Sequence, residues 1–288
     1  MILKSKSKYD LESTLYSGQS FLWNPILSDN LQAHEIVLGG TRFRVQQLSD
    51  KIDAIYPLNI TQNQSLILQN HLRVDDDLGC IYQSIESDKY LLSSFKKFEG
   101  LHLLRQDPWE CLVTFICSSN NNMKRIKLML NKLINSFDNT HTDSLGEYKT
   151  FPTPDQIIEA GEEHLRSLGF GYRAKYIFET SRIILYENID LLKLRSQNYD
   201  DNLEQLTMFP GVGDKVANCV MLFSLDNLNA FPVDVWINRV LREIYLNDSK
   251  NKIADSRLRS HFQSYFGEYS GYINHYLFHS RRNDLMSS

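Results

Sequence analysis

Two helical patterns meet at Met208-Phe209-Pro210-Gly211-Val212-Gly213-Asp214-Lys215-Val216-Ala217-Asn218-Cys219. The proline and the two glycines predict a reversal of the chain within a few residues, because glycine adopts positive φ angles freely. They also leave backbone N–H groups uncovered at the start of the second helix, where an anion such as a phosphate is favoured. A tight corner between two helices with no ligand explains the same residues, so both interpretations stay open on this stretch alone.

Lys215 is predicted to lie in the first turn of the second helix. The positive end of the helix dipole and burial both disfavour an ammonium ion there, and so favour the neutral amine, which is the nucleophilic form. Cys219 follows one turn later on the same face. A surface lysine is the simpler interpretation of this residue taken by itself.

A second candidate group is the acid of Phe231-Pro232-Val233-Asp234-Val235. An acid directly before an apolar helical stripe is most simply an N-cap, and the helix start favours its ionised form. An ionised carboxylate could also stabilise the cation-like sugar that forms when a glycosidic bond breaks. Close to Lys215 the same charge would favour the ammonium, so the sequence leaves the protonation state of the amine open.

Length and composition predict an ordinary globular chain of about two domains. The 288 residues are 42% hydrophobic, and 31 Lys and Arg against 35 Asp and Glu give a net charge of −4. This balance argues against a nonspecific polycation, although a binding face can be locally basic. No apolar run is long enough to cross a membrane, and no secretion or transit signal is seen. We therefore expect a cytoplasmic protein in a prokaryote, or a nuclear one in a eukaryote.

The hydrophobic period divides the chain into two parts. Residues 34–38 and 41–45 flank Gly39-Gly40, which predicts a tight hairpin with Phe43 and Val45 buried and with Arg42 and Arg44 on a wet face. From about residue 103 the period is helical, and Asp107-Pro108 and Thr153-Pro154 are typical helix starts. Further helices are predicted near residues 200–208, 214–225, 235–246 and 256–266.

We therefore expect an α+β fold, in which a small N-terminal antiparallel β-sheet domain (residues 1–95) packs on a larger all-helical domain (residues 96–288). The four cysteines include no CxxC pair, so zinc or iron–sulfur ligation has little support.

Several segments, taken in order, resemble the helix-hairpin-helix DNA glycosylases, and within them the 8-oxoguanine DNA glycosylase/AP lyase family. Besides the hairpin and aspartate segments, the resemblance rests on Gly18-Gln19-Ser20-Phe21-Leu22-Trp23, Arg105-Gln106-Asp107-Pro108, Phe115-Ile116-Cys117-Ser118-Ser119-Asn120-Asn121-Asn122 and Leu168-Gly169-Phe170-Gly171-Tyr172-Arg173-Ala174-Lys175-Tyr176. A hairpin alone is a weak signal, whereas these segments at near-family spacing are a strong one.

The resemblance implies a bifunctional base excision repair enzyme. Lys215 would attack C1′ of the damaged nucleotide and form a Schiff base with the sugar, while Asp234 would stabilise the developing cation. β-Elimination would then nick the strand. The substrate implied is duplex DNA containing an oxidised purine, namely 8-oxoguanine facing cytosine, which is flipped out of the helix before excision.

Further roles come from the resemblance residue by residue. The lesion base would be bound by the Gly18 carbonyl, by Cys219 and Phe278 on its two faces, and by Asn274. The opposite cytosine would be read by Asn120, Arg125 and Arg173, with Tyr172 as the wedge that fills the stack. The hairpin phosphate contact falls on Gly211 and Gly213, and a structural cation would be held by the backbone carbonyls of Thr207, Phe209 and Val212. No cofactor is required for catalysis, no membrane is involved, and a monomer is expected.

Two residues depart from the family pattern. Trp236 stands where a histidine is usual, so we expect a phosphate contact to be lost or replaced by the indole N–H. Asn274 stands where a glutamine is usual and is one methylene shorter, so we expect a displaced pocket or one that tolerates related oxidised purines.

Rival interpretations fit less well. Glycosylases of the endonuclease III or adenine-mismatch type usually carry a C-terminal iron–sulfur cluster, whereas Cys219 is the last cysteine here. A monofunctional alkylbase glycosylase would lack the lysine. The alternative outside enzymes is a non-catalytic helix-hairpin-helix protein that binds damaged DNA, and it is expected to lack either Lys215 or Asp234.

Overall fold

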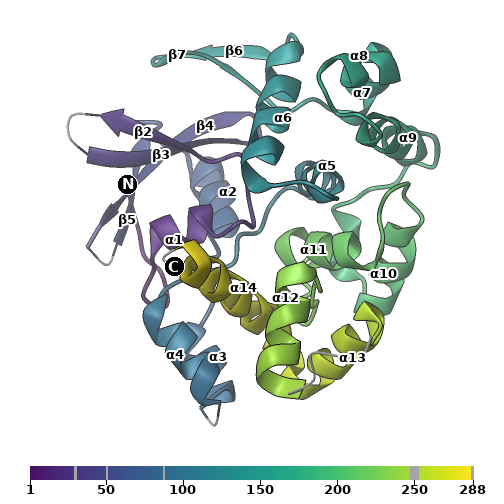
Figure 1. Cartoon of the computed structure of the whole chain (residues 1–288). Helices are drawn as coiled ribbons and strands as arrows, with labels where there is room; N and C mark the ends of the chain where they lie inside the picture. The colour runs from purple at the N-terminus through teal and green to yellow at the C-terminus, as the bar shows by residue number, and fades with distance from the viewer. Residues whose placement is uncertain (29–30, 50, 87, 247–252, 287–288) are drawn as a thin grey trace.

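The computed structural model describes residues 1–28, 31–49, 51–86, 88–246 and 253–286, and its first part is built on one antiparallel sheet (Figure 1). Its strands are β1 (Ile2–Leu3), β2 (Asn24–Ser28), β3 (Leu31–Leu38), β4 (Thr41–Leu48) and β5 (Lys51–Tyr56), in the order β1-β5-β4-β3-β2. Gly39 and Gly40 have φ angles of 53° and 77° and join β3 to β4. The predicted hairpin is therefore confirmed.

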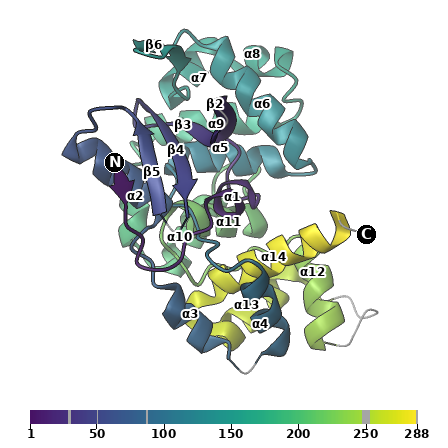
Figure 2. The same cartoon turned by 90° about the vertical axis from the view of Figure 1, so that its left-hand side faces the viewer.

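Helices that the sequence analysis did not predict accompany the sheet. They are α1 (Leu11–Tyr16), α2 (Gln62–Leu72), α3 (Leu78–Ser84) and α4 (Lys89–Lys97). Figure 2 shows α3 and α4 beside α13 and α14, away from the sheet. Leu91 and Phe95 of α4 belong to the same apolar cluster as the helical part of the chain. The division at residues 95 and 96 into two domains stays a prediction.

The remainder of the described chain is mostly helical, which confirms the α+β class. The main helices are α5 (Pro108–Ser118), α6 (Met123–Ser136), α7 (Pro154–Ala160), α8 (Glu162–Ser167), α9 (Arg173–Tyr186), α10 (Tyr199–Thr207), α11 (Asp214–Ser224), α12 (Val235–Val240), α13 (Asp255–Phe266) and α14 (Ser270–Met286). Short helical turns η1 (Lys193–Ser196), η2 (Leu241–Leu246) and η3 (Gly267–Tyr269) link some of them. No helix among the described residues is long and apolar enough to cross a membrane.

Local capping chemistry explains where the predicted helices begin. Asp107 accepts hydrogen bonds from the backbone N–H groups of Trp109 and Glu110, at 2.9 and 3.0 Å, and so caps α5. Thr153 and Gln156 form a capping box at the start of α7. These caps satisfy donors that have no partner inside the helix.

The prediction that the Arg42 side chain of β4 is exposed to solvent is wrong. A small hairpin of β6 (Thr140–Asp143) and β7 (Gly146–Lys149) covers this side chain, which is only 5% exposed. The Arg42 guanidinium pairs with Asp143, donates to the carbonyl of Gly146 at 2.7 Å and lies 4.8 Å from the centre of the Tyr148 ring. A charged residue alternating with apolar ones is buried here because a distant segment supplies its counter-charge.

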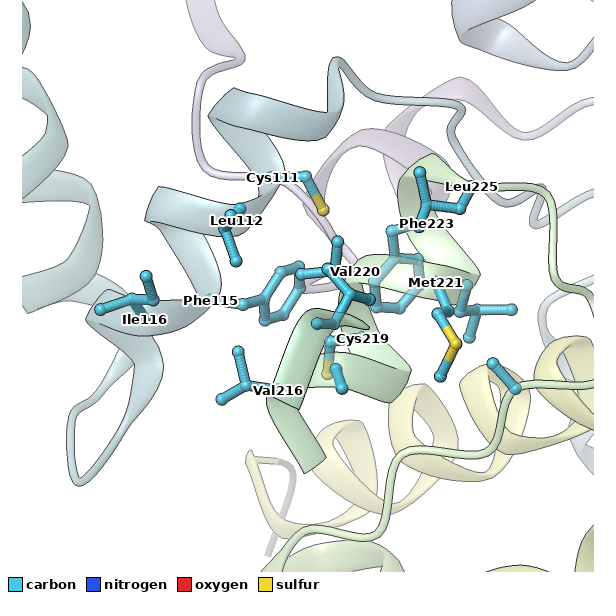
Figure 3. Packing of buried hydrophobic residues seen from close by; sticks show 14 of the residues in the cluster. Cys111, Leu112, Phe115, Ile116, Val216, Cys219, Val220, Met221, Phe223 and Leu225 are labelled. Carbon is cyan, nitrogen blue, oxygen red and sulfur yellow. The ribbon is translucent and has the colours of Figure 1, made fainter. Parts of the chain in front are cut away.

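The packing of α5 against α11 places the end of one helix beside the start of the other. The rings of Phe115 and Phe223 stack with their centres 5.5 Å apart, and Cys219 and Val220 lie in the same layer (Figure 3). All four side chains are buried. Because α11 is buried from Val216 to Ser224, its first turn is held beside the end of α5.

Candidate active site

Lys215 lies in the first turn of α11 and points to the end of α5. Its Nζ donates a hydrogen bond of 3.0 Å to the Oγ of Ser118 and lies 5.3 Å from the centre of the Phe115 ring. The side chain is half-buried. The amine is therefore held in a defined position rather than spread over the surface.

Asp234 is the N-cap of α12, as the sequence predicted. One carboxylate oxygen accepts a hydrogen bond of 2.8 Å from the N–H of Ile237. Burial raises the pKa of Asp234, and the N–H of Ile237 and the charge of Lys215 partly oppose that rise. No ion pair joins Asp234 to Lys215 in the described part of the chain, so the two groups sit near each other without direct contact.

Two cavities meet at these groups. One has a volume of about 630 Å³ and its wall is largely apolar, with Phe21, Phe115 and Ile126 among its lining residues. The other, of about 860 Å³, is an open groove lined mainly by polar and charged side chains, called the polar groove below. The two cavities share five of their lining residues, namely Ser118, Asn121, Lys215, Asp234 and Trp236. The amine and the carboxylate thus stand where an apolar pocket opens into a polar groove.

The four residues predicted to bind the lesion base all line the apolar pocket. They are Gly18, Cys219, Asn274 and Phe278. Burial raises the pKa of the Cys219 thiol to about 11, despite the opposing charge of Lys215, so this group is a thiol at neutral pH. The Nδ2 of Asn274 donates to the carbonyl of Pro232 at 3.0 Å, which commits one of its two N–H groups within the protein.

The structure also brings together three of the four residues predicted to contact the opposite base and fill the stack. Arg173, only 4% exposed, donates to the carbonyl of Asn120 at 3.1 Å and also to the carbonyl of Ser119. Tyr172 is 46% exposed, and its hydroxyl donates to the same Ser119 carbonyl at 3.1 Å. Arg125 is exposed in the first turn of α6, and among the described residues its side chain forms no hydrogen bond or ion pair with this group.

The hairpin between α10 and α11 follows the predicted course with one correction. Gly211 has a φ of +78°, and a Cβ there would overlap the ring of Tyr176. Gly213 has a φ of −95°, so the positive φ expected of it is wrong. This residue is the N-cap of α11, and an N-cap takes an extended backbone.

The three carbonyl groups predicted to hold a cation belong to this hairpin. Thr207 ends α10, and the carbonyl of Phe209 accepts a hydrogen bond of 3.1 Å from the N–H of Val212. Neutral carbonyl oxygens in one turn are a donor set suited to a hard cation.

Sequence reasoning missed three further residues of the site. Ser118 is the hydrogen-bond partner of the Lys215 amine, and His275 and Arg282 of α14 line the apolar pocket. Ser118 lies in a segment quoted for the resemblance, but no pattern in the sequence pointed to its contact with a lysine nearly a hundred positions away. For His275 and Arg282 the sequence carried no signal.

Two family models cover most of the chain. The model of the HhH-GPD superfamily base excision DNA repair protein matches residues 113–265, and that of the 8-oxoguanine DNA glycosylase N-terminal domain matches residues 1–112. The chain belongs to the 8-oxoguanine DNA glycosylase family. This agrees with the resemblance on which the site residues were predicted.

Relatives of the family match most of the chain. The N-glycosylase/DNA lyase of Saccharomyces cerevisiae is 35% identical over 282 residues, which is 88% of this chain and 73% of the yeast protein. A probable N-glycosylase/DNA lyase of Methanothermobacter thermautotrophicus is 33% identical over 231 residues, 73% of this chain and 72% of that protein. The chain is accordingly a DNA glycosylase with lyase activity, and not a non-catalytic binding protein.

Solved structures show the same architecture. The structure of MBOgg1 in complex with a low-affinity DNA ligand aligns with a TM-score of 0.90 at 31% identity, over 100% of this chain and 96% of that one. The Clostridium acetobutylicum 8-oxoguanine glycosylase/lyase, in complex with double-stranded DNA containing cytosine opposite 8-oxoguanine, gives a TM-score of 0.88 at 28% identity, over 99% and 98% of the two chains. Both of these family members are therefore seen with DNA bound.

Proposed function

We propose that this enzyme excises 8-oxoguanine facing cytosine in duplex DNA and then cleaves the abasic strand, with Lys215 as the nucleophile of the first step and as the Schiff-base group of the second. The observation that carries the proposal is the place of Lys215 and Asp234 at the junction of the apolar pocket and the polar groove. A base in the pocket and a backbone in the groove would place the sugar between these two side chains.

The chemistry uses groups that the chain itself supplies. The neutral amine of Lys215 forms a bond to C1′ while the bond from C1′ to the base breaks, and the base leaves with the bonding electrons and takes up a proton. Positive charge develops on the sugar in this step, and the carboxylate of Asp234 stabilises it. Opening of the sugar ring then gives the Schiff base.

The second step, strand cleavage, proceeds from the Schiff base. The Schiff base acidifies the proton at C2′. Loss of that proton to solvent expels the 3′ phosphate and breaks the strand. Water then hydrolyses the remaining bond between Lys215 and the sugar, which frees the amine. One side chain thus serves both reactions because it stays bonded to C1′ between them.

The apolar pocket supports recognition of an oxidised purine. 8-Oxoguanine carries a hydrogen on N7, whereas guanine has a lone pair there, so a backbone carbonyl accepts from the first and repels the second. The carbonyl of Gly18 is the group we assign to this role, since Gly18 lines the pocket. Cys219 and Phe278 would contact the two faces of the base, and the free amide groups of Asn274 would meet its pairing edge.

The loop at the end of α5 supports recognition of the opposite cytosine. Asn120, Arg125 and Arg173 would offer donors and acceptors to this base, and Tyr172 would fill the space left in the stack. Because Arg173 donates to the carbonyls of Ser119 and Asn120, it would act at least by holding this loop in place.

The hairpin supports a phosphate contact. The uncovered backbone N–H groups of Gly211 and Gly213 would contact a DNA phosphate. The carbonyls of Thr207, Phe209 and Val212 would hold a structural cation, which would supply positive charge beside that phosphate and take no part in the reaction.

We propose that the protein acts on damaged duplexes as a monomer.

An excision assay under single-turnover conditions tests this function. The substrates are duplexes with 8-oxoguanine facing each of the four bases, and a duplex with undamaged guanine is the control. We expect release of 8-oxoguanine and strand cleavage, fastest opposite cytosine, and neither reaction at guanine. Equal rates opposite all four bases would contradict the preference for cytosine, and no release from any damaged duplex would contradict the assigned substrate.

A further inference from the structure

Two side chains of α14 hold the C-terminal end of α1. The guanidinium of Arg282 donates to the carbonyl of Ser17 and to the carbonyl of Tyr16, each at 2.9 Å. The Nε2 of His275 lies 2.8 Å from the Oγ of Ser17. Carbonyls at the end of a helix have no partner within it, and a guanidinium can satisfy two of them at once. These bonds fix the last turn of α1 to α14.

Gly18 follows this turn directly and touches the same arginine. Its φ angle is +99°, and a Cβ there would lie 3.1 Å from Cε1 of Phe278 and 3.2 Å from Nη1 of Arg282. A side chain is therefore disfavoured by the backbone conformation, and its neighbours would have to shift to admit it. The backbone of Gly18 packs directly against Arg282 and Phe278.

The residue after Gly18 is fixed as well. The side-chain amide of Gln19 donates through Nε2 to the carbonyls of Thr14 and His102, at 2.8 and 2.9 Å. Its Oε1 accepts from the backbone N–H of Leu104 at 2.7 Å. With Ser17 held on one side by α14 and Gln19 held on the other, the peptide groups of Gly18 have little freedom to turn.

Arg282 holds this segment at a cost in free energy. It is partly buried in the wall of the apolar pocket, and no carboxylate forms an ion pair with it in the described part of the chain. Burial without a counter-charge lowers the pKa of its guanidinium, because a buried charge is disfavoured unless it is paired. Its contacts are backbone carbonyls and the sulfur of Met123. Costs of this kind are expected where position matters for function.

We propose that Arg282 is the positioning residue for the Gly18 carbonyl, with His275 as a second hold on Ser17. This inference rests on the proposed function, in which that carbonyl accepts the N7 hydrogen of the oxidised purine. A carbonyl in a fixed direction distinguishes N7–H from a bare N7, whereas one that can turn away loses that distinction. Arg282 thus acts on recognition of the base and not on the bond between Lys215 and the sugar.

The variant Arg282→Met tests this separation. Two rates are measured under single-turnover conditions: release of 8-oxoguanine from its duplex with cytosine, and cleavage of the same duplex carrying a preformed abasic site. The abasic substrate has no base to recognise. We expect the first rate to fall about 10- to 100-fold more than the second, as is usual when a reacting partner is displaced by a fraction of an ångström to an ångström.

The matched control is Arg281→Met. Arg281 is the neighbouring arginine on α14, and its guanidinium pairs with Glu243 at 2.8 Å. It is absent from the linings described for both cavities. We expect both rates of this variant to stay within about twofold of the wild type, since a partly exposed ion pair near the protein surface contributes little.

The outcomes separate cleanly. Equal losses in both reactions of Arg282→Met, or a loss in neither, would overturn the inference. Thermal unfolding verifies that Arg282→Met is folded. If it is not, Arg282→Lys takes its place, because lysine keeps the charge but lacks the forked donors. We then expect the same difference between the two rates, but a smaller one. A wild-type enzyme that cleaves the abasic duplex but leaves 8-oxoguanine in place would instead overturn the proposed function.

Discussion

The Nζ of Lys215 and the Oγ of Ser118 form a hydrogen bond of 3.0 Å that joins the first turn of α11 to the last residue of α5. The Ser118 hydroxyl donates in turn to the carbonyl of Phe115 at 2.7 Å, so its hydrogen is committed and a lone pair is left for the amine. This pair of bonds sets where the lysine amine stands before any substrate arrives.

Ser118→Ala should slow excision without preventing it. The variant removes one acceptor of the amine, and a hydrogen bond of this kind contributes about 0.5–1.5 kcal/mol, or roughly 2- to 13-fold in rate. Single-turnover release of 8-oxoguanine is the measurement. Ser167→Ala is the matched control, since Ser167 donates to His164 three residues earlier in the same way but lies in α8. A Ser118→Ala rate equal to that of the control would show that this bond does not position the amine.

Protonation of Asp234 should lower the rate of base release at acid pH. Burial raises its pKa above the ordinary 3.8, and the ionised form is the one that stabilises the sugar cation. The rate should therefore fall as the pH drops through this raised pKa, at a higher pH than an ordinary aspartate would give. A profile of the excision rate against pH, with binding of the same duplex measured in parallel, tests this point.

The variant Asp234→Asn provides the control for that profile. It keeps a capping oxygen, so the free energy of unfolding at pH 7 should change by less than about 1 kcal/mol while base release is strongly slowed. Because the folded-state pKa of Asp234 is raised, the wild type should gain stability relative to Asp234→Asn as the pH falls through that pKa. A wild-type stability that falls relative to the variant over this range would contradict the direction of the shift.

Gly211→Ala should weaken DNA binding and stability together. The new Cβ would overlap the Tyr176 ring. In addition, a non-glycine residue at a φ of +78° costs about 1–3 kcal/mol for its backbone conformation alone. Gly161→Ala is the control, since Gly161 has a φ of +82° with no atom within 4 Å of its Cβ. Thermal unfolding and fluorescence anisotropy with a duplex measure the two effects. Unchanged binding in Gly211→Ala would show that the hairpin does not contact DNA.

Arg173→Ala should reduce the preference for the opposite base. Without its guanidinium the carbonyls of Ser119 and Asn120 lose a charged donor, and the loop that carries Asn120 is released. We expect the ratio of excision rates opposite cytosine and opposite adenine to fall by about tenfold. Arg166→Ala, on the exposed face of α8 where Arg166 pairs with Glu162, is the control. A ratio that survives in Arg173→Ala would assign the preference to other residues.

The parts of the fold that sequence predicted are those fixed by local chemistry. The cap at Asp107, the capping residue Thr153, and the turn at Gly39-Gly40 each act within a few residues, so the sequence shows both partners at once. Asp234 was predicted as an N-cap for the same reason, and its cap is confirmed. Helix α14 was missed because it is surrounded by protein and buries polar residues such as Asn274 and His275, which leaves no clear polar face in the pattern.

The parts that sequence could not predict depend on partners far along the chain. Arg42 was expected in water because Asp143, which pairs with it, lies on a hairpin that the sequence did not predict. Lys215 was found from its own segment, whereas its partner Ser118 belongs to another helix. Arg282 contacts α1 from the opposite end of the chain, so only the folded structure shows that it touches the residue before Gly18.

Trapping with borohydride tests the role of Lys215 most directly, because this reagent reduces a Schiff base to a stable bond. With a duplex of 8-oxoguanine facing cytosine, the wild type should become covalently attached to the DNA. Lys215→Gln should give no attachment while still binding the duplex, and Lys124→Gln, which alters another lysine of the same pocket, should still be attached. Attachment of Lys215→Gln at the wild-type level would contradict the assignment of the nucleophile.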